Sequence, residues 1–349
     1  MKTLKAKIDS ILKLAYEKQA SDIHLSVGVP PVMRMNGDLV KIGQDILLPA
    51  ETEEMAKAII STLKWPMFME KGELDFSYGL PGISRFRVNA FRQRSCISLA
   101  IRIVPRTIPT LDELHLPAIL KKVVEKPHGL ILVTGPTGSG KSTTLASMIH
   151  YMNQTMRRHI ITLEDPIEYL HKHQQCIVDQ REVGFDTISF ATGLKSALRQ
   201  DPDVILVGEM RDLETIHTAI TAAETGHLVL GTLHTSSAAS TVDRIIDVFP
   251  ATQQPQIRLQ LASVLVGIIS QRLFPTSDKT GRRAVIEVLL NNSAISSLIR
   301  NEKTYQIPSV IQTSRAHGMQ SFESSLMEYV KSGIISAETA IPFKQGTTE

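Results

Sequence analysis

The sequence predicts an α/β protein of two domains, and three observations lead to that prediction. The chain has 349 residues, which is about two domains at roughly 150 residues each. In its first hundred or so residues, short alternating segments typical of antiparallel strands predominate. From about residue 116, apolar runs alternate with helix-like stretches, a pattern typical of a parallel sheet covered by helices.

Composition narrows the class of protein. Apolar residues make up 42% of the chain and charged residues 21%, values that exclude a disordered or fibrous protein. The formal net charge of +3 argues against a nucleic-acid binder that relies on overall charge, although a local basic patch stays open. The two cysteines, Cys96 and Cys176, are too few for a disulfide framework or a four-cysteine zinc site.

The sequence also predicts where the protein works. No segment is apolar over the roughly 20 residues of a membrane span. Lys5, Lys7 and Lys13 interrupt the N-terminal segment, so we expect no signal peptide. We therefore expect a soluble, cytoplasmic protein, with peripheral contact to a membrane left open.

The predicted N-terminal domain, residues 1–104, combines helices with an antiparallel sheet. Apolar residues recur at helical spacing over 4–15, and residues 51–64 also have a helical pattern. Asn36-Gly37 between two alternating segments indicates a two-residue hairpin turn. Residues 74–104 alternate as half-buried strands do.

A linker, residues 105–115, is predicted to lead into a larger domain, residues 116–349. In that domain four apolar runs have the length and composition of buried strands, and helix-like stretches separate them. These runs are residues 129–135, 159–165, 202–209 and 227–235. The tail beyond about residue 290 has helical patterns.

A glycine-rich motif follows the first of these runs and matches the phosphate-binding pattern GxxxxGK[ST]. Its glycines let successive backbone N–H groups face phosphate oxygens, and the helix that follows contributes its positive end. We expect Lys141 to reach the β- and γ-phosphates of ATP and the Ser142 hydroxyl to bind Mg²⁺. The predicted ATP-binding residues are Gly135, Pro136, Thr137, Gly138, Ser139, Gly140, Lys141, Ser142 and Thr143.

Acidic residues stand at the ends of two further strand-like runs, Glu164 in one and Glu209 in the other. Because the carboxyl ends of neighbouring parallel strands meet beside a phosphate loop, we expect both carboxylates at the site. Glycine occupies position 208, where the usual metal-binding aspartate would stand, so Glu209 is assigned to Mg²⁺. Glu164 is then the better candidate for activating the attacking water. A swapped division of roles, and helix-capping or surface roles, remain alternatives.

Histidines flank the last strand-like run. His227 precedes it and His234 ends it, where a histidine could sense the γ-phosphate or signal to the neighbouring domain. The alternative is a hydrogen-bonded structural histidine, and metal ligation is disfavoured because the spacing fits no zinc pattern. His171 and His173 are expected to be surface residues.

Arginines are concentrated between Phe76 and Leu111, a stretch without any acidic residue. A solvated sheet face and a nucleic-acid stripe are possible interpretations. The sharper hypothesis is an interface that delivers guanidinium groups to a nucleotide from another domain or subunit, which favours an oligomer. The candidates are Arg85, Arg87, Arg92, Arg94, Arg102 and Arg106.

Together these features resemble the secretion-type hexameric ATPases, and most closely the branch that retracts type IV pili. The resemblance covers nearly the whole chain. It rests on the segments ASDIHL (20–25), RFRVNAFRQR (85–94), GPTGSGKSTT (135–144), ITLEDPIEY (161–169), RQDPDVILVGEMRDLETI (199–216) and HLVLGTLHTSSAASTVDRIIDVFP (227–250).

The resemblance implies a PAS-like N-terminal domain, a RecA-like domain and a homohexameric ring. It implies Mg²⁺-dependent ATP hydrolysis that extracts pilin subunits at the inner membrane, together with a membrane platform protein, and drives twitching motility. Lys141, Glu164 and Glu209 would be the catalytic residues, with Glu164 as the catalytic glutamate and Glu209 as the acid near Mg²⁺. His227 and His234 would form the histidine box, and no nucleic acid would be a partner. Pilus-assembly and type II secretion relatives usually carry a four-cysteine zinc insertion. The two cysteines of this chain therefore favour the retraction branch.

One segment departs from the family pattern. Where the family commonly has Ala-Ile-Arg-Asn-Leu, this chain has Ala294-Ile295-Ser296-Ser297-Leu298, so a charge and a long side chain are lost. Coupling to the pilus is therefore in doubt. A non-retracting accessory pilus ATPase of the same family is the first alternative function, and a ring that translocates nucleic acid is the second.

Overall fold

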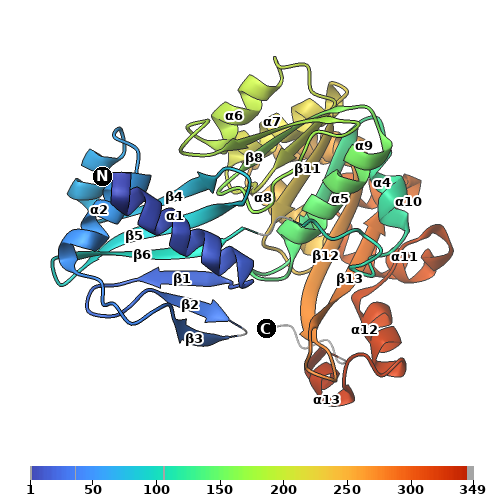
Figure 1. Cartoon of the computed structure of the whole chain (residues 1–349). Helices are drawn as coiled ribbons and strands as arrows, with labels where there is room; N and C mark the ends of the chain where they lie inside the picture. The colour runs from blue at the N-terminus through green and yellow to red at the C-terminus, as the bar shows by residue number, and fades with distance from the viewer. Residues whose placement is uncertain (1, 36, 105–106, 344–349) are drawn as a thin grey trace. The chain divides into compact units, whose positions relative to one another are not determined.

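The computed structural model describes residues 2–35, 37–104 and 107–343, and it divides into two compact units (Figure 1). Unit 1 comprises Met1–Thr107 with Glu168–Leu170, and unit 2 comprises Ile108–Ile167 with His171–Glu349. Of the predicted linker, Pro105 and Arg106 lie outside the described residues. Leu111, within the same predicted segment, is buried in a core of unit 2.

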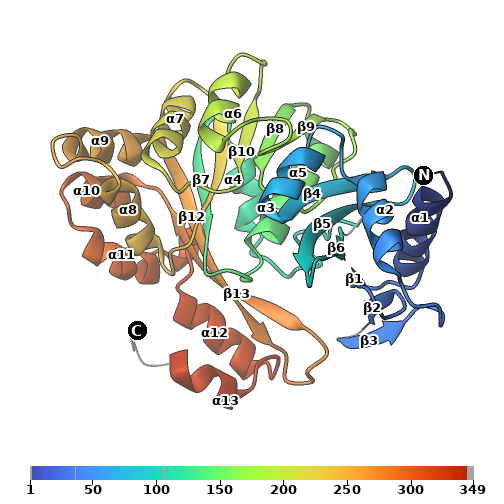
Figure 2. The same ribbon diagram turned by 90° about the vertical axis from the view of Figure 1, so that its left-hand side faces the viewer.

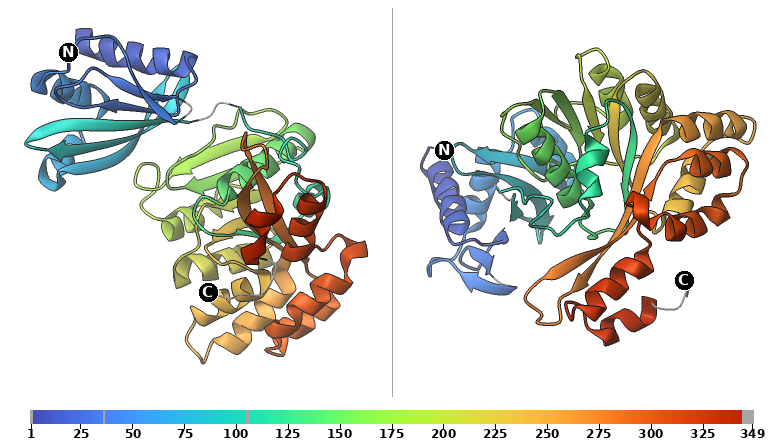
Figure 3. Two further views of the ribbon diagram at one scale, coloured as in Figure 1. Left: turned by 90° about the horizontal axis from the view of Figure 1, so that it is seen from below. Right: turned by 90° about the vertical axis from the view of Figure 1, so that its right-hand side faces the viewer.

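Unit 1 is a six-stranded antiparallel sheet with helices. Its elements are α1 (Lys2–Glu17), β1 (Asp22–Leu25), β2 (Val32–Met35), β3 (Asp38–Lys41), α2 (Pro49–Ile59), α3 (Trp65–Lys71), β4 (Glu73–Leu80), β5 (Ser84–Gln93) and β6 (Cys96–Ile103). The strand order is β3-β2-β1-β6-β5-β4, and α2 packs on β6 and against α1 (Figure 3). β2 and β3 pair on either side of the predicted turn, of which Asn36 lies outside the described residues.

Side-chain alternation along β5 separates the core of unit 1 from its outer face. Phe86, Val88 and Ala90 point into the core and are fully buried. Successive side chains on a strand face opposite sides of the sheet, so Arg85 and Arg87 point away from that core. The arginine-rich segment is therefore mostly an outer sheet face.

Unit 2 begins with a parallel sheet covered by helices. Its elements are α4 (Ile119–Val124), β7 (Gly129–Thr134), α5 (Lys141–Thr155), β8 (His159–Glu164), β9 (Ile177–Glu182), α6 (Phe190–Ala197), β10 (Val204–Val207), α7 (Leu213–Glu224), β11 (Leu228–Leu233), α8 (Ala238–Asp247), α9 (Gln254–Val264), β12 (Leu265–Pro275), β13 (Arg282–Leu290), α10 (Ser293–Arg300), α11 (Ile307–Thr313), α12 (Phe322–Lys331) and α13 (Ala337–Ala340). Short 3₁₀ helices span Thr304–Gln306, Arg315–His317 and Ile341–Phe343.

The strand order in unit 2 is β13-β12-β7-β11-β10-β8-β9, and every neighbouring pair is parallel except β12–β13. β7 lies within the sheet and is buried on both faces. Leu130 and Leu132 enter one buried cluster, whereas Ile131 and Val133 enter another. This double burial explains why the predicted strands are continuous apolar runs.

A long hairpin ends the sheet. β12 and β13 extend beyond the parallel strands, and α12 packs on β13, as Figure 2 shows from the side. Phe274 on β12 stacks near Phe322 on α12, with ring centroids 6.1 Å apart. Within the described residues, no helix has the length and apolar character needed to cross a membrane.

Candidate nucleotide-binding site

The segment between β7 and α5 forms a tight loop that only glycine can build. A Cβ on Gly135 would lie 2.2 Å from the carbonyl oxygen of Gln271 and 2.6 Å from Ser139 Oγ, so no side chain fits there. Gly138 and Gly140 both have left-handed backbone angles, with φ of 77° and 90°. Gly140 is the N-cap of α5, a helix of 15 residues, so the positive end of that helix faces the loop.

Two polar side chains of this loop are held in ways that fit a phosphate ligand. Lys141 Nζ donates hydrogen bonds to the carbonyl oxygens of Gly135, at 2.8 Å, and Pro136, at 3.1 Å. Ser139 is buried, and its Oγ has no hydrogen-bond partner among the residues that the structure describes. A buried hydroxyl without a partner costs about 1–3 kcal/mol. An anion with several oxygens would accept from Lys141 and from the backbone N–H groups.

Glu164 stands at the carboxyl end of β8, beside the end of β10. The register pairs Leu163 with Val207, so the residues that follow both strands meet at the edge of the sheet that carries the glycine loop. Glu164 Oε1 accepts hydrogen bonds from Thr162 Oγ1, at 2.6 Å, and Gln180 Nε2, at 3.1 Å. These contacts fix the orientation of the carboxylate.

Glu209 is half-buried and paired with two cationic or ionisable groups. Its Oε1 lies 2.9 Å from His234 Nε2 and also accepts a hydrogen bond from Arg211 Nε. The hydrogen bond to Glu209 raises the pKa of the Arg211 guanidinium. His234 therefore lies at the same edge of the sheet as Glu209. Arg211 was not predicted, because nothing in the sequence distinguishes it from a surface arginine.

The glycine at position 208 has a steric cause. A Cβ there would lie 2.9 Å from the carbonyl oxygen of Leu163 and 3.3 Å from the Cα of Glu164. Thr232 Oγ1 also donates a hydrogen bond of 2.5 Å to the Gly208 carbonyl oxygen. An aspartate side chain has no room at position 208, so the acidic residue stands one position later, as Glu209.

His227 lies at the opposite edge of the sheet. It precedes β11, whose six residues separate it from His234 by seven steps, or about 23 Å at roughly 3.3 Å per residue. Its Nδ1 lies 3.0 Å from the carbonyl oxygen of Ala222, at the end of α7. The structure thus brings only His234, of the two candidate histidines, to the carboxylates.

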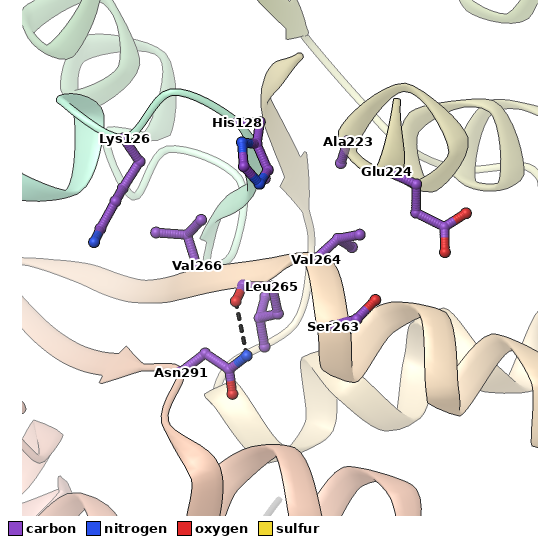
Figure 4. A pocket seen from close by; sticks show the side chains of 10 residues that line it. Lys126, His128, Ala223, Glu224, Ser263, Val264, Leu265, Val266 and Asn291 are labelled. Carbon is purple, nitrogen blue, oxygen red and sulfur yellow. Dashed lines mark hydrogen bonds between the residues drawn. The ribbon is translucent and has the colours of Figure 1, made fainter. Parts of the chain in front are cut away.

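A cavity of about 550 Å³ also lies at this opposite edge (Figure 4). Lys126, His128 and Glu224 line it, and Asn291 donates a hydrogen bond of 2.8 Å to the Leu265 carbonyl oxygen beside it. It lies at the amino ends of the parallel strands. Ligands of open parallel sheets bind at the carboxyl ends, so this cavity is not the nucleotide site.

The candidate arginines all belong to unit 1. Arg85, Arg87 and Arg92 lie on β5, Arg94 follows it, and Arg102 lies on β6, whereas Arg106 lies outside the described residues. Arg102 Nε donates to Asp22 Oδ1 at 2.9 Å. Burial raises the pKa of Asp22, but hydrogen bonds from Arg102 and Ser21 outweigh it and hold that pKa below its ordinary value. Contact between these arginines and a nucleotide stays a prediction.

Gln271, which is not among the residues predicted from the sequence, is buried on β12 behind the glycine loop. Its Nε2 donates to the Ser139 carbonyl oxygen at 2.6 Å, and its Oε1 accepts from Thr144 Oγ1 at 2.9 Å. The only signal for it in the sequence is a polar residue within an apolar run, far from the motif along the chain. Its neighbour Ser270 accepts a hydrogen bond of 2.9 Å from Thr134 and so ties β12 to β7.

Comparison with known proteins places the chain in a family. A family model described as type II/IV secretion system protein matches residues 1–341. The chain is 47% identical to the type IV pilus retraction ATPase PilT of Pseudomonas aeruginosa, over 95% of this chain and 96% of that protein. It is 44% identical to the type IV pilus ATPase PilU of the same organism, over 95% of this chain and 87% of that one.

A solved structure supports the same placement. The crystal structure of the pilus retraction motor PilT with bound ADP superposes with a TM-score of 0.90, at 48% identity and 96% coverage of both chains. This match confirms the predicted α/β fold class with its RecA-like domain. The chain therefore belongs to the type II/IV secretion system protein family.

Proposed function

We propose that the chain is an ATP-hydrolysing motor that drives disassembly and retraction of type IV pili, and that it works as a homohexamer with Mg²⁺. One observation carries the proposal: the glycine-rich loop at the start of α5, where Gly135 has no room for a side chain, lies at the same sheet edge as Glu164 and Glu209. The identity of 47% to a pilus retraction ATPase over 95% of the chain supports the same activity.

In this proposal the loop residues 135–143 bind the phosphates. The side chains of the site act mainly by positioning the phosphates and the attacking water. Lys141 exchanges its two carbonyl contacts for phosphate oxygens. Bound Mg²⁺ would neutralise charge on the β- and γ-phosphates, and Ser142 and Glu209 would hold it. Glu164, oriented by Thr162 and Gln180, would align and deprotonate the attacking water.

His234 links this chemistry to motion. Because Glu209 shares its Oε1 with His234 and Arg211, holding a metal with that carboxylate would weaken both pairings. Arginines of unit 1 then complete the charge around the phosphates from the same or an adjacent subunit. Loss of the γ-phosphate releases those contacts, and each cycle delivers at most the difference in binding free energy between nucleotide states.

The proposed partners follow from this function. The ring would act on the cytoplasmic side of the inner membrane, held there peripherally by a pilus platform protein. Nucleic acid is not expected, and ATPase activity indifferent to single-stranded DNA would remove the translocating-ring alternative. Stimulation by DNA that weakens with salt would instead favour it.

Substitutions at the site test the enzymatic part. Lys141→Ala should abolish binding of MgATP, because it removes the charge that faces the phosphates, and retained hydrolysis would refute the site. Glu164→Gln should bind ATP and hydrolyse it about 10²–10⁴-fold more slowly, as expected for a lost general base. If Glu209→Gln gives that phenotype and Glu164→Gln does not, the two roles are exchanged.

A non-retracting accessory ATPase is the second candidate, and Ser296 is the observation that favours it. Ser296 Oγ donates to the Ala262 carbonyl oxygen at 2.9 Å and lies 3.0 Å from Asn291 Oδ1. The side chain is thus engaged inside unit 2. Complementation of a strain that lacks its retraction ATPase separates the two: restored twitching supports the motor, and failure with intact ATPase activity supports the accessory role.

A further inference from the structure

Gln271 lies where one residue contacts both ends of the phosphate loop. It is 2% exposed and comes from β12, more than 120 residues after the loop along the chain. Its amide bridges the Ser139 carbonyl oxygen, at 2.6 Å, and the Thr144 hydroxyl on α5, at 2.9 Å. The orientation of the amide is fixed chemically, because a carbonyl oxygen can only accept and so the NH₂ group must face Ser139.

The backbone of Gln271 contacts the other end of the loop. Its carbonyl oxygen occupies the space that a Cβ on Gly135 would need, at 2.2 Å. Its Nε2 would lie 3.1 Å from a Cβ on Gly140. The loop thus rests on this one residue at its first and last glycine.

The bond to Ser139 also sets the direction of a phosphate-facing donor. In a planar trans peptide the C=O and the following N–H point in opposite directions. When Gln271 draws the Ser139 carbonyl towards β12, the N–H of Gly140 must point away from β12. The helical bond from Thr144 N–H to the Gly140 carbonyl, at 3.0 Å, begins α5 from the next peptide along the chain.

We propose that Gln271 is a positioning residue for nucleotide binding, which holds the Ser139–Gly140 peptide so that its N–H faces the phosphates. This inference deepens the proposed ATPase function and rests on it. Gln271 is buried behind the loop, so its removal should weaken binding rather than slow the chemical step. A neutral hydrogen bond contributes about 1 kcal/mol, which corresponds to roughly a fivefold to tenfold change in affinity.

Two variants and one control test the proposal with the full-length protein. Gln271→Met removes the donor at similar length, and Gln271→Glu replaces it with a carboxylate. Ser270→Ala is the control, since it alters the adjacent buried residue of β12 without touching the loop. The readouts are the Kd of MgADP by calorimetry, the KM and kcat for ATP, and the melting temperature without nucleotide.

We expect Gln271→Met to raise the Kd of MgADP and the KM for ATP by about tenfold, with kcat within about threefold. Gln271→Glu should bind more weakly still near pH 8 and should regain affinity, relative to the parent protein, as pH falls, because a protonated carboxyl can donate to Ser139 again. A packing defect alone would not produce that recovery. Ser270→Ala should stay within about twofold of the parent.

The outcomes separate this inference from the proposed function. If the parent protein itself fails to bind MgADP, the ATPase proposal fails. If the parent binds and both Gln271 variants bind within twofold of it, the positioning role is refuted. If Gln271→Met does not fold, the pH dependence of Gln271→Glu decides alone. A ratio of its Kd for MgADP to that of the parent protein that does not change with pH would overturn the proposal.

Discussion

Burial lowers the pKa of His171, which the sequence around it does not suggest. The segment His171-Lys172-His173 is expected at the surface, and His173 is exposed, but this expectation is wrong for His171. His171 is half-buried, and its Nδ1 is shielded from solvent without a hydrogen-bond partner among the described residues. Burial, reinforced by the charge of His150, lowers the pKa of His171 to about 4.

This shift predicts an acid-sensitive fold. The unfolded chain takes up a proton at His171 below its ordinary pKa of 6.5, whereas the folded chain does so only near 4. Stability is therefore intact above pH 6.5 and falls as pH decreases towards 4, by up to roughly 3 kcal/mol. In urea unfolding at pH 7 and pH 5, His171→Gln should lose less stability than the parent. The exposed His317→Gln is the control, and equal losses in all three proteins would contradict the assignment.

At the scale of elements, the close approach of β8 and β10 controls what can follow each strand. Gly208→Ala places a Cβ 2.9 Å from the Leu163 carbonyl oxygen, so one strand end must shift. We expect a loss of about 1–3 kcal/mol in unfolding free energy, as for other overpacked sites, and a fall in ATPase activity because Glu164 and Glu209 both move.

Gly281→Ala is the matched control for that substitution. Gly281 also belongs to unit 2, has open space around its Cβ position and is not in a left-handed conformation. Chemical unfolding of the two variants beside the parent measures the difference. Equal stabilities would mean that β8 and β10 separate more easily than their register suggests.

Strands were predictable from the sequence where an apolar run corresponds to a strand buried on both faces. The four apolar runs became β7, β8, β10 and β11, because both faces of those strands are buried. β9 was not predicted, since its side chains are mostly polar or exposed and its pairing comes from β8. β12 and β13 were missed as well, because β12 is shown to be a strand only by its long-range pairing with β7, and β13 only by its pairing with β12.

The candidate site divides along the same line. The residues proposed to bind phosphate, from Gly135 to Thr143, form a local motif and could be named from spacing alone. Gln271 could not, because its contacts join β12 to a loop that the sequence gives no reason to bring near it. Arg211 contacts Glu209 only two residues away, but nothing in the sequence distinguishes it from a surface arginine. The role of His234 needed the sheet register, which separates it from His227 by the full length of β11.

At the scale of the whole molecule, the two units have separate hydrophobic cores. The core of unit 1 is formed by α1, α2 and its sheet, and the buried clusters of unit 2 lie on both faces of the parallel sheet. We therefore expect calorimetric unfolding in two transitions. MgADP at a hundred times its Kd should stabilise unit 2 by about 2.7 kcal/mol and raise only that transition. A single transition that moves as a whole would show that the units unfold together.

The pairing of β5 with β6 places Arg87 directly opposite Arg102 on the outer face of unit 1. Like charges at directly opposed positions of a sheet repel, and Asp22 compensates only the second of them. Dissolved ions weaken that repulsion over a Debye length of about 10 Å at 0.1 M. We therefore expect the repulsion between Arg87 and Arg102 to be weaker in concentrated salt than in dilute buffer.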